Sequence, residues 1–468
     1  MKKRVLALCG AAFVAVLLFS VVAFAADAAD VAAEISNTQA YLTLAVLVIA
    51  GVLFLTEAVP LPVTAMLVPV ALAVTGIVKP GPAFANFGDS TVILFMGMFI
   101  VGESIFKTGF ADKIGDWTMR LSKGNEVRLL LLVVVVIGLM SSVLSNTGTV
   151  AVTMPMVIAM CNSSKIPPSK LLIPAAFASS LGGTMTLIGT PPNGIVNAML
   201  ASSAEAAPAE MGIRAFRFFE FAKIGIPLLI MGLLYYAFIG RHFLIDTSQR
   251  AESGKTIEDA EAAAAVAAVK AKRRPEKMWY SIGIFIFVLV IMVTEVMALH
   301  VAAMLGVCLI VATGTLTMNE AFDAVDWQTI WLFAGMLSMS TAMRDSGAAS
   351  LLAETIVHQV SSPLAIMAVI CAITAILTNF MSNTATAALM CPLAIPLAIQ
   401  TGINPMPLAM GIGISASCCF LTPIATPPNT IIFGPGKYTF IDYMKVGWPL
   451  QIISFVMCIV IIPIFWPL

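Results

Sequence analysis

The sequence predicts an all-α polytopic membrane protein with 11 transmembrane helices and two re-entrant hairpins, arranged as an inverted repeat. Three observations lead to this fold class. Hydrophobic residues make up 60% of the 468 residues and charged residues only 11%, with a mean hydropathy of +0.99, whereas soluble domains carry about 25% charged residues. Apolar runs long enough to cross a bilayer recur along the chain. Short motifs also recur at a nearly constant offset, the sign of an internal repeat.

Charge and reactive residues narrow the class of function. The 25 basic and 25 acidic residues balance, so there is no basic face for a nucleic acid. The eight cysteines lack the spacing of a zinc site or a disulfide framework, and the three histidines stand far apart in the sequence. Neither a nucleophile-base pair nor a metal-binding cluster can be identified. We therefore expect no enzyme and no cofactor other than coupling ions.

The first element is an apolar run over residues 5–25, within a segment that continues as an outer loop to residue 40. Its basic start and small-residue end also resemble a cleaved signal peptide. The run of 21 residues is long enough to span, because a helix rises about 1.5 Å per residue across a core of about 30 Å. We expect a retained first helix, although cleavage would leave the rest of the topology unchanged.

Ten further apolar runs are expected to span the membrane, and two longer runs are not. The ten lie at residues 41–59, 61–78, 91–107, 171–200, 223–243, 279–297, 300–316, 329–343, 407–432 and 446–466. Residues 129–162 and 363–399 each form a run of about 35 residues, which as one helix would reach roughly 50 Å. Each is interrupted near its middle by Ser-Asn-Thr. We expect re-entrant hairpins, whose turns are tolerated only where protein or a watery cavity covers them.

Lysine and arginine set the expected orientation, because they gather on cytoplasmic loops. The N-terminal basic residues, the basic segment at 107–128 and the linker at 244–277 fall on one face in the span count. We therefore expect an inner-membrane protein with its N-terminus and this linker in the cytoplasm and its C-terminus outside. The chain divides into residues 1–40, a first repeat at 41–222, a connecting helix and linker at 223–278, and a second repeat at 279–468.

The internal repeat is the strongest feature of the sequence. Thr56-Glu57 recurs as Thr294-Glu295, Ala-Met-Leu at 65–67 recurs at 303–305, and Phe-x-Gly-Met at 95–98 recurs at 333–336, all at the same offset (295 − 57 = 238). Ser-Asn-Thr at 145–147 recurs at 382–384 (382 − 145 = 237), and Thr-Pro-Pro-Asn at 190–193 recurs at 426–429 (426 − 190 = 236). A third Ser-Asn-Thr at 36–38 has no repeat partner, so the paired copies carry the weight.

The two repeats have opposite orientations in the span count. The helix at 41–59 runs from outside to inside, whereas its counterpart at 279–297 runs from inside to outside. This symmetry is typical of secondary transporters, which bind their solutes near the midplane where discontinuous helices meet. The sequence therefore predicts an inverted-repeat transporter in a lipid bilayer.

The residues of the paired motifs suit an anion and a cation together. Tandem prolines at 191–192 and 427–428 should break helices 171–200 and 407–432. Exposed carbonyl groups suit a hard cation, and helix N-termini with hydroxyl and amide groups suit a carboxylate or sulfate. Neither motif contains lysine or arginine, so bound sodium would supply the missing positive charge. Importing a divalent anion costs about 4.6 kcal/mol per 100 mV of interior-negative potential, which sodium coupling or anion exchange would offset.

These motifs resemble those of the divalent anion/sodium symporters, which carry dicarboxylates, citrate or sulfate. The resemblance covers essentially the full length. It includes both Ser-Asn-Thr hairpins, both Pro-Pro-Asn breaks, Thr-Glu-Ala-x-Pro at 56–60 and Val-Gly-Trp-Pro-Leu at 446–450. Residues 416–432 are similar to the family's sodium:sulfate signature, with Ile432 in place of valine. The resemblance implies a homodimer and elevator-type alternating access, in which a transport domain slides against a scaffold.

The resemblance also implies the site residues. One sodium site would use Ser141, Ser145, Asn146 and the carbonyl of Gly189, and a second would use Thr378, Asn383 and the carbonyl of Ala425. The small anionic substrate would lie between the hairpin tips, in contact with Asn146, Thr147, Ser382, Asn383, Thr384, Thr190 and Thr426.

Several functions stay open at this point. Sodium-coupled import of a C4-dicarboxylate such as succinate, malate or fumarate is preferred. A dicarboxylate or tricarboxylate exchanger and a sodium:sulfate symporter are the alternatives, because neutral Ser, Thr and Asn sites accept planar or tetrahedral anions. A channel or membrane enzyme has less support from inverted symmetry. Glu57 and Glu295 are candidate proton carriers, but their position at span ends favours a capping or interfacial role.

Overall fold

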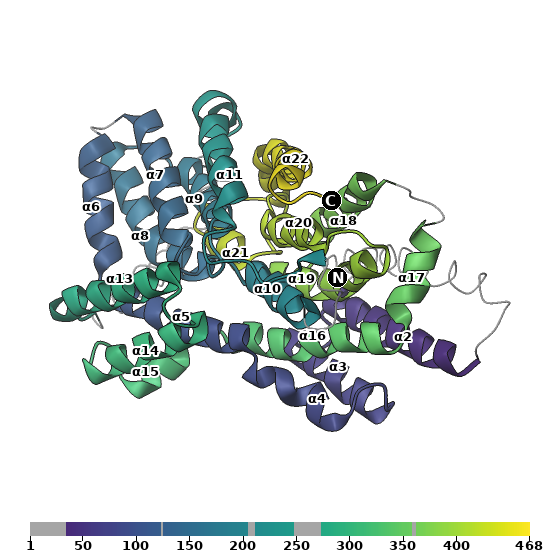
Figure 1. Cartoon of the computed structure of the whole chain (residues 1–468). Helices are drawn as coiled ribbons and strands as arrows, with labels where there is room; N and C mark the ends of the chain where they lie inside the picture. The colour runs from purple at the N-terminus through teal and green to yellow at the C-terminus, as the bar shows by residue number, and fades with distance from the viewer. Residues whose placement is uncertain (1–33, 123–124, 205–210, 248–272, 358–361) are drawn as a thin grey trace.

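The computed structural model describes residues 34–122, 125–204, 211–247, 273–357 and 362–468 (Figure 1). Within these ranges every regular element is a helix. Six of these helices are long and apolar enough to cross a membrane, and the prediction of an all-α polytopic membrane protein is confirmed. The expected first span at 5–25 and most of the linker lie outside the described residues.

The two halves contain the same series of helices. The first half has α2 (Glu34–Thr56), α3 (Leu61–Val74), α4 (Pro80–Ala85), α5 (Ser90–Lys107), α6 (Phe110–Ser122), α7 (Glu126–Ser141), α8 (Asn146–Ser164), α9 (Ser169–Gly183), α10 (Pro191–Ala204) and α11 (Ala222–Leu234). The second half has α13 (Met278–Thr294), α14 (Leu299–Ala312), α15 (Met318–Ala324), α16 (Trp327–Asp345), α17 (Ala348–Val357), α18 (Pro363–Leu377), α19 (Asn383–Gln400), α20 (Pro405–Ser417), α21 (Pro427–Phe433) and α22 (Phe440–Phe465). Each helix of the first series has its counterpart in the second, in the same order.

Residues with left-handed backbone conformation recur at the repeat offset. Glu57 (φ 47°) and Glu295 (φ 52°) follow α2 and α13 directly. Non-glycine residues seldom adopt positive φ, so this matched pair shows that the same turn is built twice. Two pairs of left-handed glycines, Gly76 with Gly314 and Gly109 with Gly347, are separated by the same offset (314 − 76 = 347 − 109 = 238). Both glutamates therefore lie at helix ends and not within a span.

The halves cross each other through small residues. α3 packs against α16, and α14 packs against α5. A Cβ added at Gly97 of α5 would lie 2.8 Å from Ala303 Cβ, and one added at Gly335 of α16 would lie 2.2 Å from the carbonyl oxygen of Ala65. Small residues allow helix backbones to approach this closely in a membrane. The recurring Ala-Met-Leu and Phe-x-Gly-Met motifs thus encode two equivalent helix crossings.

Each paired Ser-Asn-Thr tripeptide begins the second helix of a helical hairpin, directly after the turn. α7 and α8 form the first hairpin, and α18 and α19 form the second (Figure 1). The hydroxyl of Ser145 accepts a hydrogen bond from the Gly148 N–H at 3.1 Å, and that of Ser382 accepts one from the Ala385 N–H at 3.2 Å. Both serines are thus N-caps. α8 packs against α21, and α19 packs against α10, so each hairpin contacts the other half.

Both helices that carry tandem prolines are interrupted. α9 ends at Gly183 before α10 begins at Pro191, and α20 ends at Ser417 before α21 begins at Pro427. The breaks at 184–190 and 418–426 precede the prolines, whereas we expected them at the prolines. Proline is favoured in the first turn of a helix, where its missing N–H would have no intrahelical partner. The prolines therefore begin the second part of each helix.

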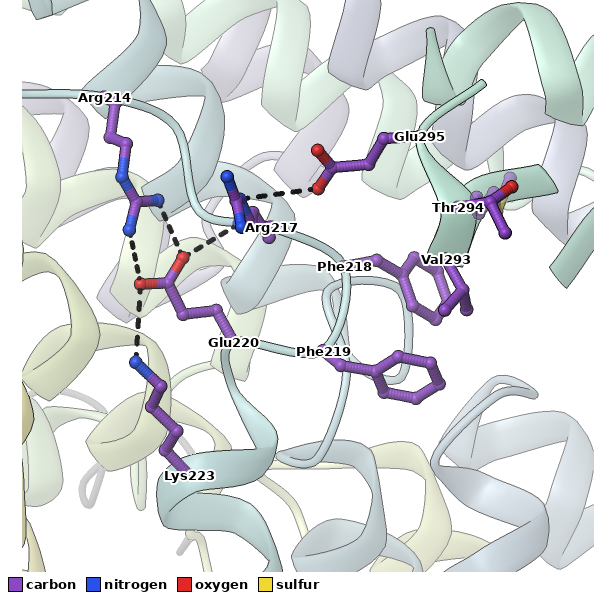
Figure 2. A pocket seen from close by; sticks show the side chains of 10 residues that line it. Arg214, Arg217, Phe218, Phe219, Glu220, Lys223, Val293, Thr294 and Glu295 are labelled. Carbon is purple, nitrogen blue, oxygen red and sulfur yellow. Dashed lines mark hydrogen bonds and ion pairs between the residues drawn. The ribbon is translucent and has the colours of Figure 1, made fainter. Parts of the chain in front are cut away.

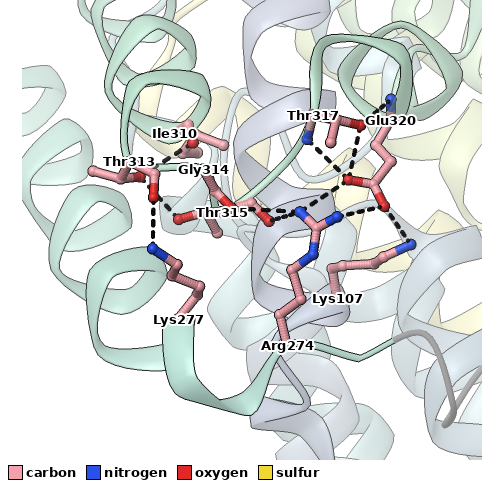
Figure 3. Close-up of polar contacts among 9 residues, drawn as sticks. All are labelled: Lys107, Arg274, Lys277, Ile310, Thr313, Gly314, Thr315, Thr317 and Glu320. Carbon is pink, nitrogen blue, oxygen red and sulfur yellow. Dashed lines mark hydrogen bonds and ion pairs between the residues drawn. The ribbon is translucent and has the colours of Figure 1, made fainter.

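A charged network joins α5 to the second half. Lys107 Nζ lies 3.0 Å from Glu320 Oε1, and an Arg274 Nη atom lies 3.1 Å from Glu320 Oε2 (Figure 3). The backbone N–H of Arg274 also donates to the carbonyl of Lys107 at 3.0 Å. Lys277 Nζ donates to the carbonyl of Thr313 at 2.9 Å. These contacts fix the start of α13 against the ends of α5 and α14.

Candidate transport site

The first cluster of the site surrounds the side-chain amide of Asn146, which is 7% exposed. One end atom of this amide lies 2.5 Å from Ser141 Oγ, 2.9 Å from the carbonyl oxygen of Ser179 and 3.1 Å from that of Gly189. The nitrogen satisfies these neighbours, because carbonyl oxygens only accept hydrogen bonds. In the opposite orientation Asn146 Oδ1 accepts from Ser141 at 2.5 Å and faces two carbonyl oxygens. In that orientation the four oxygens are suited to hold a cation between them.

The second cluster repeats the first around Asn383, which is 8% exposed. The hydroxyl of Thr378 lies 2.8 Å from Asn383 Oδ1 and 2.5 Å from the carbonyl oxygen of Ala416. A hydroxyl has a single proton, so it donates to only one of these acceptors at a time. Two oxygens again share one donor at a buried point of the second half.

The two clusters use equivalent positions of the repeat. Ser141 corresponds to Thr378, Asn146 to Asn383 and Ser179 to Ala416, all at one offset (378 − 141 = 383 − 146 = 416 − 179 = 237). The carbonyls of Ser179 and Ala416 were missed by the sequence reasoning. The motifs gave no sign of them because a backbone carbonyl leaves no mark on residue type. The constant offset alone pairs them.

Asparagine side chains hold both breaks open. The Asn193 amide nitrogen donates to the carbonyls of Gly183 at 3.3 Å and Thr186 at 2.8 Å. Asn429 does the same for the carbonyls of Cys419 at 3.2 Å and Thr422 at 3.0 Å. These side chains supply hydrogen-bond donors to backbone carbonyls where the helical pattern is interrupted. The asparagine of Thr-Pro-Pro-Asn therefore shapes the unwound backbone that carries the carbonyls of Gly189 and Ala425.

One threonine in each break joins it to the neighbouring hairpin. The hydroxyl of Thr186 donates to the carbonyl of Ser142, and the hydroxyl of Thr422 donates to the carbonyl of Asn379 at 2.7 Å. Thr186 also accepts from the N–H of Gly189 at 3.1 Å. The breaks and hairpin turns are thus held together by hydrogen bonds within the protein.

The remaining predicted residues lie around these clusters. Ser145 belongs to the turn beside Asn146, with its hydroxyl used as the helix cap, and Ala425 lies in the second break, 2% exposed. Thr147 is exposed and Thr384 is half-buried, each in the first turn after a cap. Buried threonines end the two breaks, Thr190 at 1% and Thr426 at 3% exposure.

The broken helices of the two halves pack against each other. The rings of Phe177 in α9 and Phe420 in the second break have centroids 5.0 Å apart. A Cβ added at Gly413 of α20 would lie 3.3 Å from Asn193 Oδ1. α8 also packs against α21, and α10 packs against α19, so each helix that begins at a hairpin turn contacts one that begins at a break of the other half. Helix N-termini carry positive partial charge and free N–H groups, which favour a bound anion.

Comparisons with known proteins agree with this architecture. The chain matches the citrate transporter family over residues 51–390 and again over 289–467. It is 30% identical to an uncharacterised transporter of Haemophilus influenzae, over 90% of this chain and 91% of that protein. It is 24% identical to the sodium-dependent dicarboxylate transporter SdcS of Staphylococcus saprophyticus, over 87% of this chain and 83% of the relative. Its fold is similar to the crystal structure of the Alcanivorax borkumensis YdaH transporter, with a TM-score of 0.58, 14% identity and coverage of 92% of this chain and 99% of the other.

Proposed function

The chain belongs to the citrate transporter family, and from that premise we propose that it imports a C4-dicarboxylate, of the succinate, malate and fumarate class, together with sodium. The membership confirms the resemblance to divalent anion/sodium symporters, and it identifies the protein as a multi-pass membrane transporter and not an enzyme. Relatives named as sodium-dependent dicarboxylate transporters support the choice of substrate and coupling ion.

The observation that carries the proposal is the pair of equivalent oxygen clusters. Each joins a buried asparagine amide, a hydroxyl and at least one backbone carbonyl, around Asn146 in one half and Asn383 in the other. Backbone and amide carbonyls and hydroxyls are ligands of hard cations. An asparagine amide carries both a carbonyl oxygen and a donor nitrogen, so a flip of the amide brings its oxygen to the same point. We assign one sodium ion to each cluster.

The proposed anion lies between the two sodium ions. Thr147 and Thr384 follow the helix caps, and Thr190 and Thr426 end the breaks, so four hydroxyls accompany four helix N-termini. No lysine or arginine belongs to these motifs. The charge of a dicarboxylate is therefore balanced by the bound sodium ions and by helix dipoles. This balance explains why the anion would need sodium to bind.

Alternating access is supported by unequal packing of the two hairpins. α19 packs closely along α16, whereas its counterpart α8 makes few contacts with α5. In an inverted repeat, exchange of these two arrangements produces the state that opens to the opposite side. We propose that the hairpins and broken helices move as an elevator against α2–α5 and α13–α16. The homodimer, the inner-membrane location and the cytoplasmic linker are parts of the same proposal.

Reconstituted protein tests the coupling. Uptake of labelled succinate into liposomes should need an inward sodium gradient and should collapse in Asn146→Ala and Asn383→Ala. Equal uptake in sodium-free choline buffer would remove sodium from the proposal. Vesicles without internal substrate separate symport from exchange, since an exchanger then takes up nothing. Competition by succinate, citrate, sulfate, tartrate and glutamate against labelled succinate identifies the substrate class.

A further inference from the structure

A charged cavity lies apart from the Ser-Asn-Thr clusters. It has a volume of about 400 Å³ and opens between the segment before α11 and the end of α13 (Figure 2). We call it the Arg217 cavity; its charged and aromatic lining includes Arg214, Arg217, Phe218, Glu220, Lys223 and Glu295. Three basic and two acidic residues line it, which leaves one positive charge in excess (3 − 2). A small cavity of this charge is suited to an anion.

One carboxylate of the cavity is fixed. The two Nη atoms of Arg214 donate to the two carboxylate oxygens of Glu220, each at 2.8 Å. The backbone N–H of Arg217 and the indole Nε1–H of Trp466 also donate to this carboxylate, each at 3.0 Å. Burial alone would raise the pKa of Glu220, but these hydrogen bonds lower it to about 2. The ion pair of Glu220 with Arg214 therefore forms a fixed part of the cavity lining.

The other carboxylate is exchangeable. Arg217 Nε lies 3.5 Å from Glu295 Oε1, and the two side chains are 72% and 50% exposed. Exposed ion pairs with such geometry contribute little to stability. An arginine has five N–H donors, and two of them can bind the two oxygens of one carboxylate at the same time. Arg217 contacts Glu295 through Nε at 3.5 Å, which is longer than a close charged hydrogen bond. A carboxylate from solution can take the place of Glu295 with little loss.

The cavity is connected to the transport site through the backbone. The carbonyl of Phe218, a lining residue, accepts a hydrogen bond from the Leu187 N–H at 3.0 Å. Leu187 lies in the break at 184–190, two residues before Gly189, whose carbonyl belongs to the first cluster. An anion in the cavity thus rests beside the segment that shapes the proposed sodium site.

We propose that the Arg217 cavity is a second binding site for small carboxylate anions, in which Arg217 exchanges Glu295 for the carboxylate of the solute. Lys223, 43% exposed and 4.0 Å from Glu220, supplies further positive charge at its edge. The site needs no sodium, because arginine and lysine supply the charge that the Ser-Asn-Thr motifs lack. Only the identity of the anion, a transported dicarboxylate, rests on the proposed function.

Calorimetric titration of the purified protein with choline succinate, in sodium-free choline buffer, tests the second site. Wild-type protein and the Asn146→Ala/Asn383→Ala variant should bind succinate alike, since the cavity does not involve either asparagine. Arg217→Gln should weaken binding roughly tenfold through loss of a bidentate charged contact. Glu295→Gln should strengthen it about two- to fivefold by removing the competing carboxylate. Arg128→Gln, at an exposed arginine on α7, is the matched control and should bind as wild type.

Two further outcomes keep this inference separate from the transport proposal. Arg217→Lys keeps the positive charge but loses the forked pair of donors, so it should bind succinate with intermediate affinity. It takes the place of Arg217→Gln in the comparison if that variant does not fold. Equal affinities in Arg217→Gln and Arg128→Gln, or no sodium-free binding at all, would overturn the second site while sodium-driven uptake could still hold. Conversely, Arg217-dependent binding in a protein without sodium-driven uptake would sustain the site and refute the transport proposal.

Discussion

Substitution of Gly183 by alanine tests the first cluster without removing any proposed ligand. Gly183 is the last residue of α9 and packs against Asn146. A Cβ added there would lie 2.4 Å from Asn146 Oδ1, 2.9 Å from Nδ2 and 3.0 Å from Cγ. The closest ordinary contact is 3.4 Å, so the amide must move by about 1.0 Å (3.4 − 2.4). Because the amide ends a short side chain, we expect it to move while the protein still folds.

The magnitude follows from the distances in the cluster. The amide lies 2.9 and 3.1 Å from the carbonyls of Ser179 and Gly189, and a further shift of about 1 Å would place it outside hydrogen-bonding range. The same shift would take Asn146 Oδ1 away from a sodium ion at this point. A hydrogen bond to a charged group contributes about 1.5–3 kcal/mol, which corresponds to a roughly 10- to 150-fold change in affinity. We expect the sodium concentration for half-maximal uptake to rise by this factor.

Sodium titration of labelled succinate uptake in proteoliposomes measures this change. Gly102→Ala is the matched control, because a Cβ at this buried glycine of α5 would lie 3.5 Å from Leu144 Cδ2, an ordinary contact. The control should keep the wild-type sodium dependence. The reasoning would be refuted if Gly183→Ala folded normally, as judged by size-exclusion chromatography and thermal unfolding, and kept the wild-type sodium dependence.

Three other predictions concern the second cluster, the packing and the charges. Thr378→Val should raise the half-maximal sodium concentration about tenfold, because the shared donor of Asn383 and Ala416 is lost, whereas Thr378→Ser should leave it unchanged in the same uptake assay. Tyr438→Phe should reduce the free energy of unfolding by about 1–3 kcal/mol, since the buried hydroxyl bonds the Ser169 carbonyl and the Ile173 N–H; a thermal-unfolding midpoint equal to wild type would contradict this. The Glu220 carboxyl, with its pKa lowered from 4.5 to about 2, should contribute its full stabilisation above about pH 4.5 and lose it as the pH falls toward 2, so Glu220→Gln should weaken the acid dependence of the unfolding midpoint.

The general architecture could be predicted from the sequence because it depends on which residue types occur at which positions. Long apolar runs predict membrane helices, and the recurring Ala-Met-Leu and Phe-x-Gly-Met motifs mark positions where only small residues fit at a helix crossing. The left-handed pair Glu57 and Glu295 shows that even the turns follow the repeat. Such features depend on local composition and spacing, which a single sequence carries in full.

The detailed geometry of the candidate site could not be predicted from residue types. Ser145 and Ser382 are helix caps. Their positions in the sequence are compatible with both capping and ion binding, so the sequence alone does not distinguish the two roles. The carbonyls of Ser179 and Ala416 contribute through the backbone, so residue type gives no signal for them. The breaks precede the prolines because proline is accepted at a helix start. The ion pair of Arg217 with Glu295 joins residues that lie far apart in the sequence, so no local pattern predicts it.

The ratio of sodium to succinate flux tests the central claim most directly. Uptake of ²²Na⁺ and of labelled succinate is measured side by side in proteoliposomes of the wild type, with protein-free liposomes as the background. One ion at each of the equivalent clusters predicts that at least two sodium ions enter with every succinate, and that Asn146→Ala or Asn383→Ala abolishes both fluxes together. Succinate entry without any accompanying ²²Na⁺ entry would contradict the account.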